Sequence, residues 1–189
     1  MSAANILTAS RIALVPVFAA AVVAAGPSGP HDSMNGASWA AVAIFALASL
    51  SDLFDGYLAR RFNSVTALGE VLDPLADKIL VGAALVLLVL YRAFPLWAAL
   101  VIAIREVAVS VLRSAALRRG RRMPASIQGK LKTALQIPMV IVWLFPPAGF
   151  LATIQQVAMY VALTLTVVSG VAYLMKARRL LSPAEMRPE

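Results

Sequence analysis

The chain has 189 residues, of which 61% are hydrophobic, and its mean hydropathy is +0.83. Soluble domains are typically about 45–50% apolar, so this composition excludes an ordinary soluble domain and predicts an integral membrane protein. Cysteine is absent and His31 is the only histidine, which excludes thiolate zinc sites, haem ligation and Cys or His nucleophiles. The net charge of +8 would suit a nucleic-acid partner, but in a membrane protein the positions of the basic residues must be considered first.

Six apolar stretches follow one another along the chain, each near the roughly 20 residues that a helix needs to cross the hydrocarbon core. Their approximate ranges are 8–25, 37–59, 71–91, 95–117, 131–145 and 154–175. The connections are short and rich in Gly and Pro, and none is long enough to hold a separate domain. We therefore expect an all-α integral membrane protein with six transmembrane helices in one bundle, and residues 1–189 forming a single domain.

Lys and Arg are concentrated in alternate connections. Arg60 and Arg61 follow the second stretch, and both the connection after the fourth stretch and the C-terminal tail are strongly basic, whereas the opposite connections contain only Arg92. Basic segments remain on the cytoplasmic side of a membrane and attract anionic headgroups. We therefore expect a multi-pass protein of the cell membrane, with both termini in the cytoplasm and no nucleic-acid partner.

Side chains near the ends of these stretches indicate how the bundle lies in the bilayer. Arg11 interrupts the first stretch and no basic segment precedes it, so we expect a retained helix rather than a cleavable signal peptide. Arg11 could extend to the headgroups or face a site inside the bundle. Three tryptophans near the outer ends of their stretches are expected to anchor at the membrane interface: Trp39, Trp97 and Trp143.

Four aspartates lie in residues 51–78, beside long apolar runs. Asp52 and Asp55 are three residues apart, and Asp73 and Asp77 are four apart, so on helices each pair projects from one face. Carboxylates at membrane depth are costly and repel one another, so they require a cationic partner. Because oxygen ligands select hard cations, the pattern predicts a cage for Mg²⁺, Mn²⁺ or Ca²⁺, opening on the cytoplasmic side.

Parts of this stretch also have a purely structural interpretation. Acids can form ion pairs with nearby Arg or Lys, although four acids in two helical pairs favour a functional site. Asp73 followed by Pro74 is typical of a helix start. Gly56 and Ala59 leave a bare groove beside the acids in which a ligand could lie, but small residues also serve helix packing. On their own, these two residues favour packing.

Basic residues of the fourth and fifth stretches are candidates for a second site, one that binds a phosphorylated substrate. Arg105 and Arg113 are eight residues apart, which places them within about 40° of each other around a helix. Lys130 and Lys132 lie near the start of the fifth stretch. Arg105 lies inside an apolar segment and needs a partner. Glu106 is adjacent in sequence and is expected to point elsewhere, so a bound phosphate or an aspartate is the better candidate.

The acidic stretch also follows a fixed pattern: Asp52-x-x-Asp55-Gly56-x-x-Ala59-Arg60, then eight residues, Gly69, three residues, Asp73, three residues and Asp77. In every fixed position this pattern resembles the signature of the CDP-alcohol phosphotransferase family. The segments NILTASRIALVP and REVAVSVLRSAALRRGRRMPASIQGKLKTALQ are similar to the bacterial members that make phosphatidylglycerophosphate. Together these segments cover about half of the chain.

The resemblance implies a six-helix homodimeric enzyme that joins an alcohol to the phosphatidyl group of CDP-diacylglycerol and releases CMP. It implies two Mg²⁺ or Mn²⁺ ions, with Asp77 as general base and with four metal ligands: Asp52, Asp55, Asp73 and Asp77. It also implies a CDP pocket lined by Gly56, Ala59, Arg60, Thr66 and Gly69. The expected acceptor is sn-glycerol 3-phosphate, giving phosphatidylglycerophosphate, with its phosphate bound by Arg105, Arg113, Lys130 and Lys132.

Three other functions remain open from the sequence. The same reaction could use another acceptor, and inositol phosphate is the strongest candidate because it would need the same basic residues. Intramembrane acids also mark ion paths, so a divalent-cation transporter is an alternative, although these acids gather near one membrane face. A structural lipid-binding protein is the third. CMP release from CDP-diacylglycerol distinguishes the enzyme from the last two.

Overall fold

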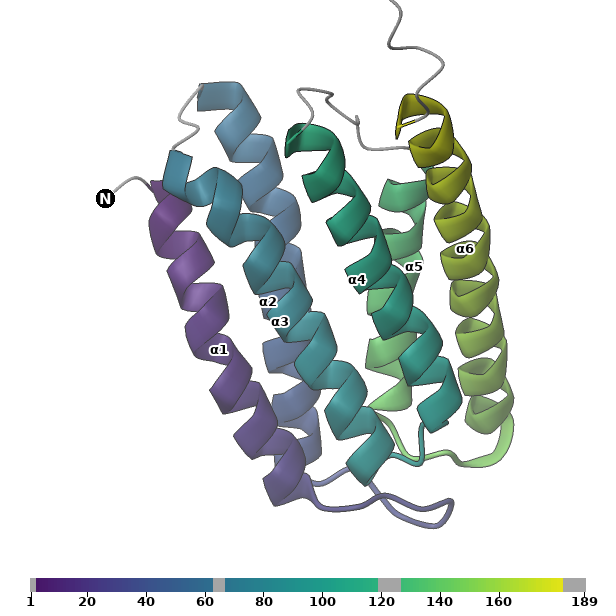
Figure 1. Cartoon of the computed structure of the whole chain (residues 1–189). Helices are drawn as coiled ribbons and strands as arrows, with labels where there is room; N and C mark the ends of the chain where they lie inside the picture. Colours follow the sequence, from purple (N-terminus) through teal and green to yellow (C-terminus); the bar gives the residue numbers. More distant parts are fainter. Residues whose placement is uncertain (1–2, 63–66, 119–126, 182–189) are drawn as a thin grey trace, which may run out of the picture.

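The computed structural model describes residues 3–62, 67–118 and 127–181, except for the side chains of residues 3–9, 52–62, 67–77, 127–133 and 179–181. The described residues form six α-helices and no strand, which confirms the predicted all-α class (Figure 1). There is one helix for each predicted apolar stretch. The helices are α1 (Ala3–Ala25), α2 (Gly36–Phe62), α3 (Ala67–Tyr91), α4 (Leu96–Arg118), α5 (Ile127–Trp143) and α6 (Gly149–Leu181).

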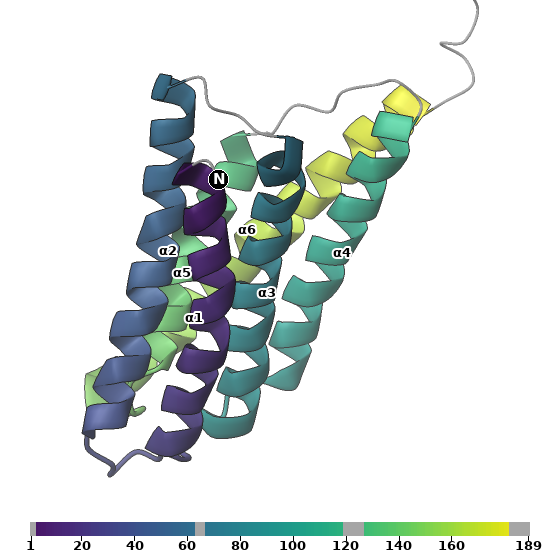
Figure 2. The ribbon, with the colours of Figure 1, turned by 90° about the vertical axis from the view of Figure 1, so that its left-hand side faces the viewer.

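The helices run alternately up and down, which gives the bundle two distinct ends (Figure 1). One end, here called the motif end, comprises the starts of α1, α3 and α5 and the ends of α2, α4 and α6. The opposite end, here called the loop end, holds the connections 26–35, 92–95 and 144–148. Helix α1 packs against α2 and α3, whereas α6 packs against α4 and α5. Figure 2 shows α4 and α6 leaning away from α2 toward the motif end.

Two residues at the loop end stop α1 and start α2. Gly26 has a φ of +75°, in the left-handed region that favours glycine, and this conformation ends α1. Asn35 caps α2, because its Oδ1 accepts a hydrogen bond from the backbone N–H of Ser38 at 2.8 Å. The Nδ2 of Asn35 donates to the carbonyl of Ala25 at 3.2 Å. One side chain therefore joins the end of α1 to the start of α2.

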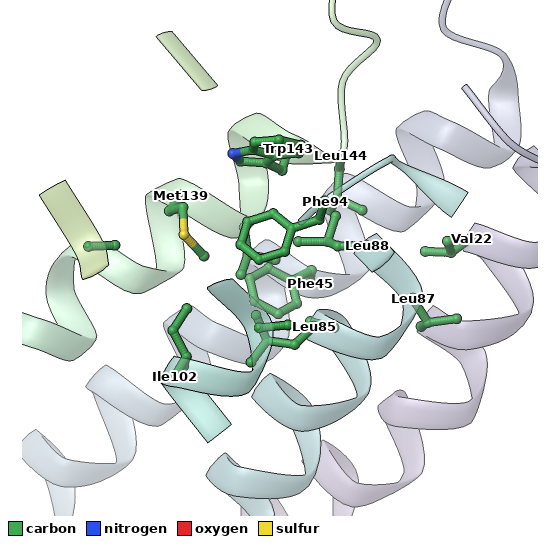
Figure 3. Close-up of a cluster of buried hydrophobic side chains, with 14 of the residues drawn as sticks. Val22, Phe45, Leu85, Leu87, Leu88, Phe94, Ile102, Met139, Trp143 and Leu144 are labelled. Atoms are coloured by element: carbon green, nitrogen blue, oxygen red, sulfur yellow. The ribbon is translucent and has the colours of Figure 1, made fainter. Parts of the chain in front are cut away.

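Among the residues whose side chains are described, the larger buried cluster lies toward the loop end and contains side chains from all six helices (Figure 3). The ring centroids of Phe18 and Phe45 are 5.4 Å apart, which joins α1 to α2. Phe94 meets Trp143 edge to face, with centroids 4.8 Å apart, an arrangement that aromatic pairs prefer. This second pair connects the segment after α3 to the end of α5. The core therefore holds the two halves of the bundle together.

The prediction that Trp143 anchors at the membrane interface is wrong. Its side chain is 5% exposed, and its indole Nε1 donates to the carbonyl of Gln155 at 2.9 Å. Because the indole N–H finds an acceptor inside the protein, it does not need the polar interface. Trp39 and Trp97 are 55% and 52% exposed, and for them the interfacial role stays a prediction.

Arg92, the one basic residue in the connections expected to lie opposite the cytoplasmic side, is buried at the loop end. Its Nε donates to the carbonyl of Leu144 at 3.2 Å, and its Nη1 donates to the carbonyls of Tyr91, at 3.0 Å, and Gly26. Tyr91 is the last residue of α3, and Gly26 and Leu144 directly follow α1 and α5, so one guanidinium connects three helix ends. Burial lowers the pKa of Arg92, and the charge of Asp32 opposes this shift.

Among the residues whose side chains are described, one helical stretch is long and apolar enough to cross a membrane. This stretch is Gly149–Arg178, with 30 residues and a mean hydropathy of 1.9. Four shorter apolar helical stretches accompany it: Ser10–Ala25, Gly36–Ser51, Lys78–Tyr91 and Ala134–Trp143. Six membrane-spanning helices and cytoplasmic termini stay predictions.

Candidate functional site

The predicted acidic pairs lie toward the motif end of two helices that both pack against α1. Asp52 and Asp55 belong to the C-terminal part of α2, and Asp73 and Asp77 belong to the N-terminal half of α3. Both pairs are therefore helical, as the metal-site prediction requires, and each spacing places its two residues on one helix face. Their side chains lie outside the described residues, so metal binding by the four carboxylates stays a prediction.

The structural interpretation of Asp73 and Pro74 as a helix start is wrong. Helix α3 begins at Ala67, before both residues, and runs through them to Tyr91. A proline inside a helix removes one backbone donor. In this chain α1 nevertheless continues past Pro16 and α5 past Pro138. Prolines are tolerated in this way in membrane helices, and an ordinary helix cap therefore does not account for Asp73.

The expected CDP pocket also falls at the motif end. Gly56, Ala59 and Arg60 lie on α2 and Gly69 lies on α3, whereas Thr66 lies outside the described residues. Lys130 and Lys132 lie in the first turns of α5, and their side chains are also outside the description. Where side chains are described, no three His, Cys, Asp or Glu residues gather as metal ligands. The two acidic pairs are not in that part of the chain.

Arg105 is paired with Glu106, the neighbour that was expected to point away from it. Its Nη1 lies 3.2 Å from the Oε1 of Glu106, so the two side chains form an ion pair. The expectation that adjacent residues on a helix point apart is therefore wrong for this pair. Both side chains are long and flexible enough to bend toward each other, although their Cα–Cβ bonds diverge. Glu106 is thus a carboxylate partner of Arg105.

Both arginines of α4 also reach α6. The Nη2 of Arg105 donates to the Oγ of Ser169 at 2.9 Å, and the Nη2 of Arg113 donates to the phenolic oxygen of Tyr173 at 3.1 Å. Ser169 and Tyr173 are 1% and 3% exposed. The Cγ of Arg105 lies 3.2 Å from where a Cβ on Gly170 would be, so α6 passes close to the arginine stem. The structure thus confirms that Arg105 and Arg113 share one side of α4, since both bond to the same helix.

Sequence reasoning missed Ser169, Gly170 and Tyr173. They lie inside an apolar stretch that was treated only as a membrane span, and one serine or tyrosine there does not interrupt the pattern. A signal was nevertheless present, because Ser169 and Tyr173 are four residues apart and therefore share a helix face. Small and polar residues on one face of an apolar helix indicate a contact with another helix.

Arg11 is 1% exposed, which decides between its two predicted roles. A side chain that extended to the headgroups would keep its guanidinium accessible. The burial of Arg11 inside the bundle, on α1, is the arrangement expected if it faces an internal polar region. Arg11 therefore lies on α1, the helix that contacts both helices carrying the acidic pairs.

Comparison with known proteins places these features in a family. The family model described as CDP-alcohol phosphatidyltransferase matches residues 1–168. A relative from Mycobacterium tuberculosis named probable phosphatidylglycerophosphate synthase is 43% identical over 176 residues, which cover 93% of this chain and 81% of the relative. A relative from Bacillus subtilis named CDP-diacylglycerol--glycerol-3-phosphate 3-phosphatidyltransferase is 40% identical over 179 residues, covering 91% of this chain and 93% of the relative.

The fold is also similar to that of a solved structure. The crystal structure of Mycobacterium tuberculosis phosphatidylinositol phosphate synthase in apo form superposes with a TM-score of 0.61 and 19% sequence identity. The superposition covers 98% of this chain and 91% of that one. At this identity the likeness concerns the fold alone, whereas the sequence match over residues 1–168 identifies the family. The chain belongs to the CDP-alcohol phosphatidyltransferase family.

Proposed function

We propose that this protein transfers the phosphatidyl group of CDP-diacylglycerol to sn-glycerol 3-phosphate, giving phosphatidylglycerophosphate and CMP. The observation that carries the proposal is the similarity, over about nine-tenths of the chain, to relatives named for this reaction or its product. The arginine pair on α4 supports it, since an acceptor that carries a phosphate needs cations of its own. Inositol phosphate remains the rival acceptor for the same reason.

The reaction is a displacement at phosphorus. The oxygen of the acceptor 1-hydroxyl bonds to the β-phosphorus of CDP-diacylglycerol, the bond from that phosphorus to the bridging oxygen breaks, and CMP leaves. We assign acceptance of the hydroxyl proton to Asp77, which requires its carboxylate to come within about 3 Å of that hydroxyl. Gly56, Ala59, Arg60, Thr66 and Gly69 are proposed to hold the CDP group.

Asp52, Asp55, Asp73 and Asp77 are the residues that would hold divalent cations. Their carboxylate oxygens are the hard ligands that Mg²⁺ and Mn²⁺ prefer, so the donor set fits two such ions. When bound, the ions supply positive charge against the diphosphate, which is the main requirement of phosphoryl transfer. The protein's own part is to fix these acids on two helices, so that the donor diphosphate and the acceptor meet in one orientation.

The placement in the membrane is part of the proposal. We assign the protein to the cell membrane as a multi-pass homodimer, with the motif end and both termini in the cytoplasm. Three exposed basic residues of the motif end support this orientation: Arg118, Lys176 and Arg178. At the loop end the connections contain one Lys or Arg, Arg92, which is buried. An amphiphilic donor explains the location, because its acyl chains remain in hydrocarbon while its nucleotide reaches water.

The proposal is tested by CMP release from CDP-diacylglycerol in mixed micelles with a panel of acceptors. We expect turnover with glycerol 3-phosphate and little with inositol phosphate, serine or free inositol. Asp52→Asn should abolish release with every acceptor. Asp32→Asn is the matched control, because Asp32 is exposed at the loop end and should be replaceable without loss. Turnover with inositol phosphate but not with glycerol 3-phosphate would reverse the choice of acceptor.

The acceptor site is tested separately by Arg113→Ala. Removing this guanidinium should raise the KM for glycerol 3-phosphate by about tenfold or more, since a hydrogen bond to a charged group typically contributes about 1.5–3 kcal/mol. The KM for CDP-diacylglycerol should not change. Arg118→Ala, an exposed position on the same helix, is the control and should alter neither value. Equal effects of the two variants on the acceptor KM would remove Arg113 from the site.

A further inference from the structure

We propose that Ser169 and Tyr173 of α6 are positioning residues for the acceptor phosphate, because they hold the guanidinium groups of Arg105 and Arg113. The inference rests on the proposed function, and it adds α6 as a fifth helix to a site otherwise built from α2, α3, α4 and α5. Helices α4 and α6 both run from the loop end to the motif end (Figure 1). Their two polar contacts therefore occur in the same order along both helices.

The hydroxyl of Ser169 is oriented to accept from Arg105. Its Oγ donates to the carbonyl of Thr166 at 3.0 Å, which uses its single hydrogen and leaves its lone pairs for the Nη2 of Arg105 at 2.9 Å. Ser169 is 1% exposed, so water does not compete for this contact. The stem of Arg105 lies against Gly170, where no side chain separates it from α6. The path of the arginine is thus defined at its stem and at its tip.

Tyr173 holds Arg113 without neutralising it. The group that accepts from the Nη2 of Arg113 is a hydroxyl and not a carboxylate. A carboxylate in this position would form an ion pair and compete with a bound anion. A phenol supplies the hydrogen bond that orders the guanidinium but leaves its positive charge available. Tyr173 is 3% exposed, so its ring is itself fixed by packing.

Arg105 retains an unused donor. Its Nε is buried and has no hydrogen-bond acceptor among the described residues, whereas its Nη1 and Nη2 are bonded to Glu106 and Ser169. A buried donor without an acceptor is costly, and an oxygen of a bound phosphate would satisfy it. Arginine also loses much conformational freedom when it binds an anion, and this loss is reduced when neighbouring groups hold it beforehand. Two ordered guanidinium groups therefore form a better phosphate site than two mobile ones.

The test is Tyr173→Phe, which removes the phenolic oxygen and keeps the ring. We expect the KM for glycerol 3-phosphate to rise about three- to tenfold, as for the loss of one hydrogen bond, with little change in kcat or in the KM for CDP-diacylglycerol. Tyr160→Phe is the matched control, because it makes the same change on the same helix at a side chain that is 55% exposed. It should leave all three values unchanged. Ser169→Ala should act like Tyr173→Phe, through Arg105.

A double variant separates positioning from a general effect on the fold. If Tyr173 acts through Arg113, adding Tyr173→Phe to Arg113→Ala should not raise the acceptor KM further. A general weakening of the helix contact would instead lower activity equally in both backgrounds. Additive effects of the two substitutions, or a fall in kcat with both KM values unchanged, would overturn the inference.

The outcomes also separate this inference from the proposed function. If the wild-type protein does not release CMP with glycerol 3-phosphate, the proposed function fails and the inference fails with it. If the wild type turns over but Tyr173→Phe and Ser169→Ala both keep the wild-type acceptor KM, the proposed function stands and only the positioning role is wrong.

Discussion

The burial of Arg92 shows how a charged residue can serve structure alone. Its guanidinium donates to carbonyls at the ends of three helices, where carbonyl groups accept no hydrogen bond from within the helix. Arginine suits this position because its planar group presents several donors in fixed directions, whereas lysine has donors at one point only. Arg92 therefore contributes to the loop end as a connection between helices, far from the motif end.

Arg92→Lys should destabilise the protein while leaving its substrate affinities unchanged. A lysine amine cannot reach all three carbonyls. The carbonyl of Tyr91 keeps the backbone N–H of Ser28 as a donor, but a buried carbonyl of Gly26 or Leu144 left without a donor would cost about 2 kcal/mol. We expect a lower melting midpoint in detergent and unchanged KM values for both substrates in the remaining folded protein. Arg118→Lys, at an exposed site, is the control. Equal midpoints for the two variants would show that the three hydrogen bonds contribute nothing to stability.

The ion pair between Arg105 and Glu106 could not be predicted from the positions of the two residues on the helix. The expectation that adjacent residues point apart follows from their Cα–Cβ directions. It neglects the length of the two side chains, which meet at 3.2 Å. In an apolar surrounding a charge without a partner is costly, and this favours a conformation that brings an opposite charge close. Side-chain length must therefore be considered together with helical angle.

At the scale of the elements, the number and order of the helices could be predicted because apolar stretches alternate with Gly-rich and Pro-rich loops. The residues at which the helices begin and end could not be predicted in this way. Helix α6 spans Gly149–Leu181, beyond the apolar stretch 154–175 at both ends. Hydrophobicity locates the part of a helix that suits hydrocarbon, whereas backbone hydrogen bonds continue into the polar boundary. The same distinction explains why α3 begins before Asp73.

The site could be predicted only in part, for a physical reason. The four aspartates stand out because charges are costly in an apolar stretch, and the match of residues 1–168 to the family model confirms the family that their spacing indicated. Ser169 and Tyr173 are compatible with any apolar helix, so their role depends on which helix lies opposite. Their spacing of four residues indicates a shared helix face, but which helix lies opposite that face is tertiary information.

Gly170 gives a prediction about the contact between α4 and α6. Gly170→Ala would place a Cβ 3.2 Å from the Cγ of Arg105, closer than ordinary van der Waals contact, so the arginine or the helix must shift. We expect a higher KM for glycerol 3-phosphate and a lower melting midpoint. Gly82→Ala on α3 is the matched control, because a Cβ there meets nothing within 4 Å. If both variants behave like the wild type, the close approach has no functional role.

At the scale of the whole molecule, the two ends of the bundle differ in kind. The loop end is tied together by neutral caps and one buried arginine, Arg92. The motif end carries the acidic pairs, the proposed phosphate site and exposed basic residues. The polar residues of α4 and α6 extend from this end into the bundle, as far as Arg105 and Ser169. A polar reaction of a lipid substrate needs this asymmetry, because the reacting groups must be accessible from water while the acyl chains remain in hydrocarbon.

The asymmetry predicts which end faces the cytoplasm, and the absence of cysteine makes the test direct. Ser33→Cys places a thiol in an exposed part of the loop end, and Arg178→Cys places one in an exposed part of α6 at the motif end. Because basic segments stay in the cytoplasm, a membrane-impermeant maleimide should label Ser33→Cys in intact spheroplasts and Arg178→Cys only after lysis. The cysteine-free parent shows any background labelling, and CMP release shows that each variant is folded. Labelling of Arg178→Cys before lysis, with Ser33→Cys protected, would place the motif end outside the cell, away from the cytoplasmic supply of glycerol 3-phosphate that the proposed reaction requires.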